Sequence, residues 1–205
     1  MAGVEVGASG FRVKSGWATA VLVVGSLDAP RVIERSIVAL SDPALPETRQ
    51  PYHAATGREE TDQAKVKRRV KIVQRAARRS VGEWLERQKS MGVRVRGAGL
   101  VVGSQIEPGA IANPHIRAHA HEGKLFRTVI VDVLEQCGLR CRILIERNAY
   151  ADAAAILRRS EAELKRAVTA MGTTIGRPWG ANEKLAALAA WISLPDCGGA
   201  AAASL

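Results

Sequence analysis

The order of strand-like and helix-like segments is the feature of this sequence that most restricts its fold. Residues 11–24 and 31–40 are rich in apolar and β-branched residues and flank a turn at 25–30, which predicts an antiparallel hairpin. Beyond the hairpin, we expect helices at 61–90, 115–136, 151–171 and 181–194, and strands at 93–103 and 140–150. Strand–helix–strand crossovers after a hairpin require a mixed sheet. The sequence therefore predicts an α/β fold in which a mixed sheet with an opening β-hairpin carries helices on both faces.

A single domain is long enough for these elements. The chain has 205 residues, of which 47% are hydrophobic, so it can bury a core of ordinary size. We expect one domain at 11–194, a disordered N-terminus at 1–10 and a flexible tail at 195–205. No apolar run approaches the roughly 18–20 residues of a membrane span, and the first ten residues do not resemble a signal peptide. The 3 cysteines are too few for a disulfide framework. Together, these features are typical of a cytoplasmic, bacterial-type protein that has no membrane partner.

Positive charge is concentrated in one segment. The chain carries 30 Lys and Arg residues against 20 Asp and Glu residues, and residues 61–100 hold 12 of these cations but 3 of the anions. Such a local excess attracts polyanions, which makes nucleic acid, either DNA or RNA, the first candidate partner. A solvated helix face, a protein partner and an acidic ligand are the alternatives.

The helix expected at 61–90 carries most of this charge. Thr61 is placed to cap its start and Gly92 to end it. Apolar residues recur every three or four positions along one side: Val66, Val70, Val73, Ala77, Val81 and Trp84. The rest of its surface holds the cations that we expect to contact phosphates: Lys65, Lys67, Arg68, Arg69, Lys71, Arg75, Arg78 and Arg79.

The strand ends indicate where a ligand would bind. In open α/β sheets, ligands bind beyond the carboxyl ends of the strands. The segments at these ends are 14–16, 103–107 and 146–148. We expect the main site there.

Three segments of the chain resemble parts of a known family. FRVKSGWATAVLV at 11–23 is similar to a first strand in which a short turn precedes Gly-Trp, and VRVRGAGLVVGSQIE at 93–107 is similar to a central strand. The closing segment at 164–194 resembles a Gly-rich loop that leads into a helix with metal-binding acids. With the element order, these segments resemble the RNase H-like superfamily, and within it the RuvC-type Holliday-junction resolvases. The resemblance implies a DNA-acting nuclease whose clustered carboxylates hold two Mg²⁺ or Mn²⁺ ions.

The acids of this chain match that pattern incompletely. The resemblance places an Asp on the first strand, where this sequence reads Arg-Val-Lys-Ser at 12–15. Glu183 matches well, Glu107 matches loosely, and Glu146 adds a carboxylate at a strand end, so these three are the candidate catalytic residues, with Glu146 and Glu183 as metal ligands. The alternatives are a salt bridge for Glu146 and a helix-dipole role for Glu183. A cation such as Lys14 would repel Mg²⁺ and attract phosphate, so we also count it among the nucleic-acid-binding candidates.

A Gly-rich loop at 172–180 leads into the last helix. Arg177, Trp179 and Lys184 combine a cation, a flat ring and a helix N-terminus, which suits a phosphate or a stacked base. We include them among the nucleic-acid-binding candidates. The alternative is that Trp179 seals the end of the sheet.

Three histidines lie close together in the sequence. His115 and His119 share one face of the expected helix at a spacing by which two imidazoles can bind one metal ion. His121 points elsewhere unless the helix starts later, and Glu122 is a candidate for a further ligand or for a residue that supports the ligands. The alternative is that they are solvated or face phosphate. His53 lies far away in a Pro-rich loop and is not expected to join them.

Three functions are consistent with these observations. The first is a nucleic-acid-binding protein without the ordinary two-metal nuclease site, and the second is a Mg²⁺- or Mn²⁺-dependent nuclease that uses Glu107, Glu146 and Glu183. The third is a protein-interaction module in which the helix at 62–90 pairs with a partner or with a second copy of the chain in a homodimer. Exposure of Trp84 would favour this third function, and burial would count against it.

Overall fold

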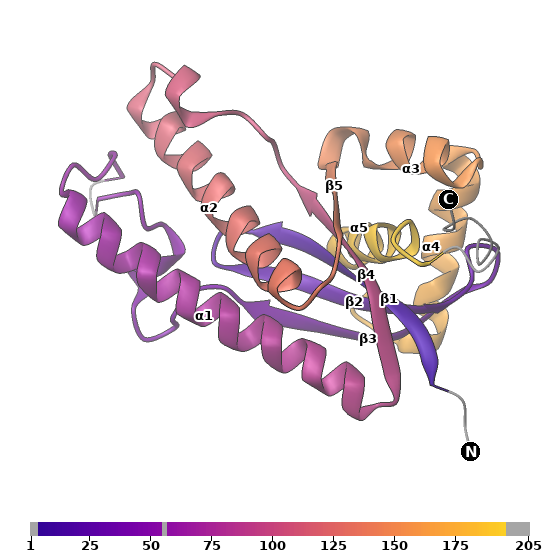
Figure 1. Ribbon diagram of the computed structural model, residues 1–205. Helices are drawn as coiled ribbons and strands as arrows, with labels where there is room; N and C mark the ends of the chain where they lie inside the picture. The colour runs from indigo at the N-terminus through magenta and orange to yellow at the C-terminus, as the bar shows by residue number, and fades with distance from the viewer. Residues whose placement is uncertain (1–3, 55–56, 196–205) are drawn as a thin grey trace, which may run out of the picture.

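The computed structural model describes residues 4–54 and 57–195, which form one five-stranded sheet with helices around it (Figure 1). The strands are β1 (Glu5–Lys14), β2 (Trp17–Gly25), β3 (Pro30–Ala39), β4 (Val93–Val102) and β5 (Cys141–Ile145). In the order β3-β2-β1-β4-β5, the first three strands are antiparallel neighbours, whereas β4 runs parallel to both β1 and β5. This is the mixed sheet with an opening hairpin that the sequence predicts.

The beginning of the chain differs from the prediction. The segment expected to be one strand, 11–24, reverses at Ser15 and Gly16 and contributes to both β1 and β2. Gly16 has a φ of +83°, which glycine adopts without strain. The predicted disorder at 1–10 is wrong for residues 5–10, because they pair with β2 and β4 as part of β1 and are largely buried. Residues 1–3 and the expected tail beyond Pro195 lie outside the described residues.

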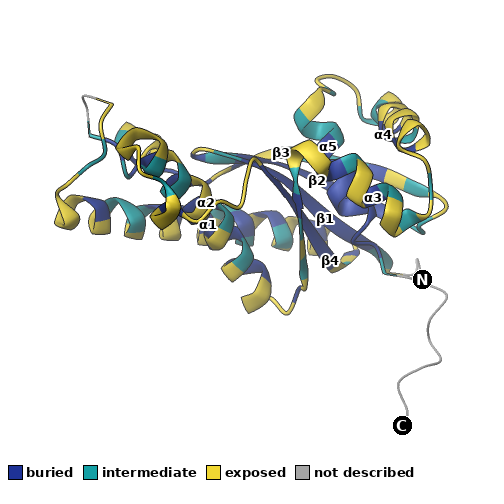
Figure 2. Ribbon diagram, turned by 90° about the horizontal axis from the view of Figure 1, so that it is seen from above, coloured by how far each residue is buried: buried dark blue, intermediate teal, exposed yellow. Residues whose placement is uncertain are grey.

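Two layers of helices cover the sheet. The described helices are α1 (Gln63–Ser90), α2 (Pro114–Gln136), α3 (Ala149–Leu157), α4 (Glu161–Ile175) and α5 (Ala181–Trp191). α1 and α2 pack on one face of the sheet, and α3, α4 and α5 pack on the other, so that the buried strands lie between them (Figures 1 and 2). The N-terminal parts of α1 and α2 project beyond the sheet together with the β3–α1 connection (Figure 1). None of these helices is long and apolar enough to cross a membrane.

Several element boundaries differ from the prediction for local reasons. Asp62, and not Thr61, caps α1, since its side chain accepts the N–H groups of the first turn. The strand expected at 140–150 ends at Ile145 and leads into a short 3₁₀ turn. The helix expected at 151–171 is divided in two, because the chain turns at a left-handed Arg158 and α4 starts with a new cap at Ser160.

Glycines on the sheet allow α5 to lie unusually close to it. A Cβ atom at Gly10 of β1 would lie 1.9 Å from the carbonyl oxygen of Ala186. On β4, Gly99 faces Ala189 and Gly97 faces Ser193, so α5 runs antiparallel to this strand. α5 therefore begins at the end of the sheet where β1 and β4 finish.

Candidate nucleic-acid interface

The carboxyl ends of the parallel strands meet around one hollow, as the sequence predicts. Lys14 ends β1, Gly103 and Ser104 follow β4, and Glu146 follows β5. Together with Arg12, these residues line a hollow of about 310 Å³, which we call the sheet-end hollow. It combines side chains of both charges at the place where an open α/β sheet binds its ligand.

Arg12 dominates the charge inside this hollow. Its side chain is 2% exposed and forms an ion pair with the carboxylate of Glu146, which is 44% exposed. The guanidinium also donates to the carbonyl oxygens of Val13 and Val101. Burial lowers the pKa of Arg12, and the charge of Glu146 raises it. A buried cation therefore lies in the segment of the first strand where the resemblance implies a metal-binding acid, and it forms an ion pair with Glu146.

The three carboxylates predicted to be catalytic have separate partners. Glu146 lines the sheet-end hollow, whereas Glu107 lies 2.6 Å from the Nζ atom of Lys124, which holds the pKa of Glu107 below its usual range. Glu183 accepts the Gly180 N–H at 2.9 Å and so caps α5. Among the described residues, no three acidic side chains lie close enough to hold one metal ion together. As arranged, these carboxylates do not fit an ordinary two-metal site, and a catalytic role for them stays a prediction.

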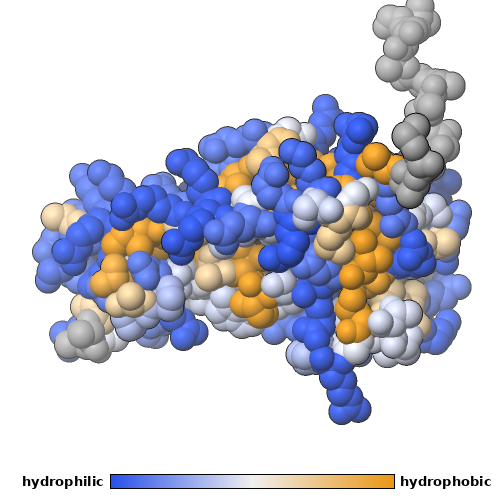
Figure 3. Space-filling view, turned by 90° about the horizontal axis from the view of Figure 1, so that it is seen from below, coloured by the Kyte–Doolittle hydropathy of each residue, from blue (hydrophilic) through white to orange (hydrophobic). Residues whose placement is uncertain are grey.

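The cations of α1 form a long basic surface. At about 1.5 Å per residue, the helix extends roughly 42 Å. Seven of the predicted cations are exposed, and we call them the α1 basic surface: Lys65, Lys67, Arg68, Lys71, Arg75, Arg78 and Arg79. In the described part of the chain, Asp62 lies 3.8 Å from Lys65, and the other six have no acidic side chain within 4 Å. Hydrophilic side chains dominate the face of the molecule seen in Figure 3, although apolar side chains gather there in several patches, one of them elongated.

Four of these cations surround a shallow hollow. Arg68, Lys71, Arg75 and Arg78 follow one another at spacings of three and four residues, so they lie on the same side of α1. The hollow has a volume of about 340 Å³. Without acidic partners, these side chains are available to a polyanion.

The remaining predicted cation of α1 has a structural role. Arg69 forms an ion pair with Glu60 at 3.4 Å, and both side chains are nearly buried. Arg69 also donates to the carbonyl oxygens of Pro51 and His53, at 3.3 and 3.1 Å. It therefore holds the β3–α1 connection against the helix, and these contacts leave few of its N–H groups free to bind a phosphate.

The apolar side of α1 packs inside its own domain. Val73, Val81 and Trp84 are fully buried in the core between α1, α2 and the sheet. The Trp84 indole N–H also donates to the hydroxyl of Ser9 on β1 at 3.1 Å. Burial of Trp84 counts against an interaction module in which this apolar side pairs with a partner helix.

The predicted site residues near α5 lie on a different surface. Arg177 and Trp179 line a second hollow, of about 660 Å³, which neither Lys14 nor Lys184 lines. The indole N–H of Trp179 donates to the carbonyl of Val168 at 2.8 Å, so packing against α4 fixes the ring. Arg177 and Trp179 thus line one hollow and Lys14 lines another, and the role of Arg177, Trp179 and Lys184 in nucleic-acid binding stays a prediction.

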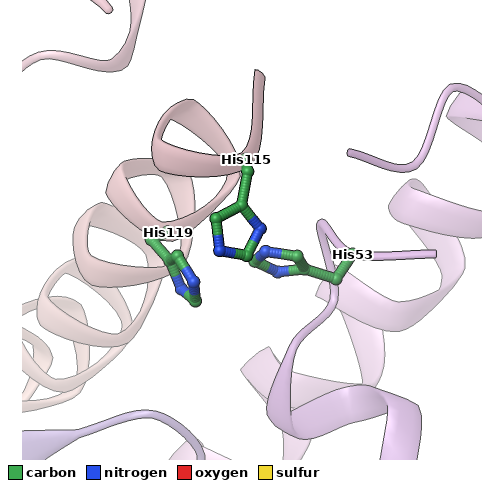
Figure 4. A group of neighbouring side chains, drawn as sticks. All are labelled: His53, His115 and His119. Carbon is green, nitrogen blue, oxygen red and sulfur yellow. The ribbon is translucent and has the colours of Figure 1, made fainter. Parts of the chain in front are cut away.

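The histidines converge in a way that the sequence did not predict. His53, expected to be remote, lies against the first turns of α2, where His53, His115 and His119 offer ligand atoms within 4.8 Å of one another (Figure 4). His121 points elsewhere, as predicted, and its ring stacks on that of Tyr52 with 4.8 Å between the centroids. His119 also lines the sheet-end hollow.

Comparisons with known proteins address the fold. No model of a protein family matches the chain, and neither does any curated protein. Among solved structures, the RuvC of T. thermophilus in complex with a Holliday junction substrate covers 90% of each chain at 12% identity, with a TM-score of 0.50. The chain has the RNase H-like fold of RuvC. A second structure of Thermus thermophilus RuvC covers 90% of this chain and 91% of its own, at 10% identity and a TM-score of 0.48.

Proposed function

We propose that this RuvC-like protein binds nucleic acid in the cytoplasm and does so without the ordinary two-metal nuclease site. The observation that carries the proposal is the α1 basic surface, where six of seven exposed cations have no acidic partner within 4 Å among the described residues. Cations of this kind bind phosphates mainly because they release the counter-ions condensed on nucleic acid. The Holliday junction held by T. thermophilus RuvC makes branched DNA the first substrate to test.

The sheet-end hollow supports the second half of the proposal. The buried Arg12 is paired with Glu146, and Lys14 adds a further positive charge to the same hollow. Mg²⁺ prefers several oxygen ligands. Among the described residues, Glu146 is the carboxylate that lines this hollow, and the fixed guanidinium beside it opposes Mg²⁺ binding. A phosphate oxygen is the better match for such a charge distribution.

The proposal is tested by the salt dependence of binding. The affinity of the protein for duplex, single-stranded and four-way-junction DNA, and for RNA of matched sequence, is measured at several salt concentrations. A variant in which Arg68, Lys71, Arg75 and Arg78 are all replaced by Gln should bind more weakly. On duplex DNA, its log–log salt slope should be shallower by up to about 3.6, since each neutralised phosphate contributes about 0.9.

A matched control separates the α1 basic surface from net charge. Replacing Arg140, Arg142, Arg158 and Arg166 by Gln removes the same charge from exposed positions outside α1. We expect this control to keep most of the wild-type slope. Equal salt slopes for the wild type and the α1 variant would refute the proposal that the α1 basic surface binds nucleic acid.

The nuclease alternative is tested in the same samples. Each binding reaction is incubated with Mg²⁺ or Mn²⁺ and then analysed on a denaturing gel. We expect no metal-dependent cleavage. Cleavage that Glu183→Gln abolishes would contradict the second half of the proposal and would establish a nuclease with an altered set of carboxylates.

A further inference from the structure

Three imidazoles from two distant segments form a compact cluster beside the sheet-end hollow. His53 comes from the β3–α1 connection, and His115 and His119 come from the first two turns of α2 (Figure 4). The ring centroid of His53 lies 5.2 Å from that of His115 and 4.4 Å from that of His119. The centroids of His115 and His119 are 4.6 Å apart. The three residues therefore surround one small volume.

The Nδ1 atom of each ring already faces an oxygen. His53 Nδ1 lies 2.7 Å from a carboxylate oxygen of Glu122, and His119 Nδ1 lies 3.4 Å from the other, which is an ion-pair distance without a hydrogen bond. His115 Nδ1 lies 2.9 Å from the carbonyl oxygen of Gly57. A carboxylate or carbonyl on one nitrogen orients the ring and leaves Nε2 as the ligand atom, which is the usual arrangement around histidines that bind metal.

One of these Nε2 atoms has no hydrogen-bond partner although it is buried. The side chain of His53 is 5% exposed, and its Nε2 atom makes no hydrogen bond. Nearly all buried polar groups in proteins are satisfied, so an unpaired nitrogen that faces two further imidazoles points to a missing ligand. A cation bound there would satisfy His53 and bring charge close to the buried Glu122.

The buried carboxylate favours a cation as well. Glu122 is 1% exposed and contacts both His53 and His119. Burial raises the pKa of Glu122, and the hydrogen bond to His53 lowers it. A divalent ion on the imidazoles would stabilise the ionised form of this carboxylate.

The segment that carries His53 is held firmly in place. Arg69 of α1 donates to the backbone carbonyl of His53, and His53 pairs with Glu59 in an isolated β-bridge. Glu59 in turn forms an ion pair with Arg117 of α2 at 2.6 Å. The cluster is therefore supported from both helices, as a preorganised metal site requires.

We propose that His53, His115 and His119 form a site for one divalent transition-metal ion, with Zn²⁺ as the first candidate, which fastens the β3–α1 connection to α2. Imidazole nitrogen suits Zn²⁺, Co²⁺ and related ions and does not suit Mg²⁺. Three protein ligands leave one position of a tetrahedral shell for water or for a ligand oxygen. This site uses none of the carboxylates considered for a nuclease, although His119 and Glu146 both line the sheet-end hollow, and it does not depend on the proposed nucleic-acid binding.

The test uses metal alone and contains no nucleic acid. The full chain, prepared without a histidine tag and stripped with chelator, is titrated with Co²⁺ while its visible absorption is recorded, and Zn²⁺ is then added to displace it. We expect one equivalent of Co²⁺ with a tetrahedral spectrum, displacement by Zn²⁺, and a higher Tm with Zn²⁺ but not with Mg²⁺.

Variants at exposed histidines keep the test independent of folding. His115→Gln and His119→Gln alter exposed side chains, and circular dichroism confirms that each variant is folded. Each should weaken Co²⁺ binding at least about tenfold, since even changes to outer-shell partners have effects of this size. The matched control is His121→Gln, because His121 lies on the same helix and stacks on Tyr52 outside the cluster. An absent Co²⁺ spectrum in the wild type, unchanged binding in the two cluster variants, or an equal loss in the control would overturn the proposal.

Discussion

Replacing Gly10 by Ala tests how closely α5 packs on the sheet. The added Cβ atom would lie 1.9 Å from the carbonyl oxygen of Ala186, 2.6 Å from the nitrogen of Ala190 and 2.9 Å from the carbonyl carbon of Ala186. All three are backbone atoms, so no side chain can rotate away. To reach an ordinary contact of about 3.4 Å, α5 must retreat by roughly 1.5 Å along much of its buried length. Overpacking of a core costs about 1–3 kcal/mol, and a clash with the helix backbone belongs at the upper end, near 3 kcal/mol.

Thermal and urea unfolding, followed by circular dichroism, measure this loss. For a chain of this length, about 3 kcal/mol corresponds to a Tm lower by roughly 6–12 °C. Gly82→Ala is the matched control, because Gly82 lies within α1 and a Cβ atom there meets nothing within 4 Å. Alanine has the higher helix propensity, so the control should be stabilised by about 0.5–1 kcal/mol. A Gly10→Ala variant within about 0.5 kcal/mol of the wild type would refute the close packing of α5.

Three further predictions concern charged and titratable groups. Glu146→Ala leaves the buried Arg12 without its counter-ion and should lower the free energy of unfolding by about 1–3 kcal/mol. In a double-mutant cycle, adding Arg12→Met should restore part of this stability. If the two effects simply add, the ion pair does not stabilise the protein. Burial raises the pKa of Cys141 to about 12, so about one thiol in ten thousand is ionised at pH 8. Iodoacetamide should therefore label Cys141 only after unfolding, and the masses of the digested peptides measure the labelling. Fast labelling of Cys141 in the native protein would show that its thiol is not buried. The hydrogen bond from Arg117 lowers the pKa of Glu59 below its ordinary value of 4.5. The stabilisation that this pair gives the folded protein is therefore complete above pH 4.5 and is lost as the pH falls through the pKa that Glu59 has in the folded protein. The difference in Tm between the wild type and Glu59→Gln should shrink from pH 7 to pH 3, and a constant difference would contradict the pairing.

Much of the candidate interface could be predicted from the sequence because its parts are local. The cations of α1 lie within one helix, and helical spacing alone separates Lys71 and Arg75 from the buried Val73. The sheet-end hollow could also be predicted, since the carboxyl ends of parallel strands necessarily meet at one edge. In contrast, Arg69 belongs to the same basic segment, and only its contacts with Glu60 and the connection reveal a structural role.

The amino-acid sequence by itself determined the mixed sheet, the charged side of α1 and most of the order of elements, because each of these depends on the spacing of neighbouring residues. It did not separate β1 from β2 or α3 from α4. Tertiary structure alone decided which distant side chains meet. Arg12 and Glu146 are 134 positions apart, and His53 and Glu122 are 69 apart. The Pro-rich segment around His53 has no periodicity that would fix its position, so only packing against α1 and α2 brings its ring to the other two imidazoles. Local pattern encodes local conformation, whereas a cluster of this kind arises from the way in which complete elements pack against one another.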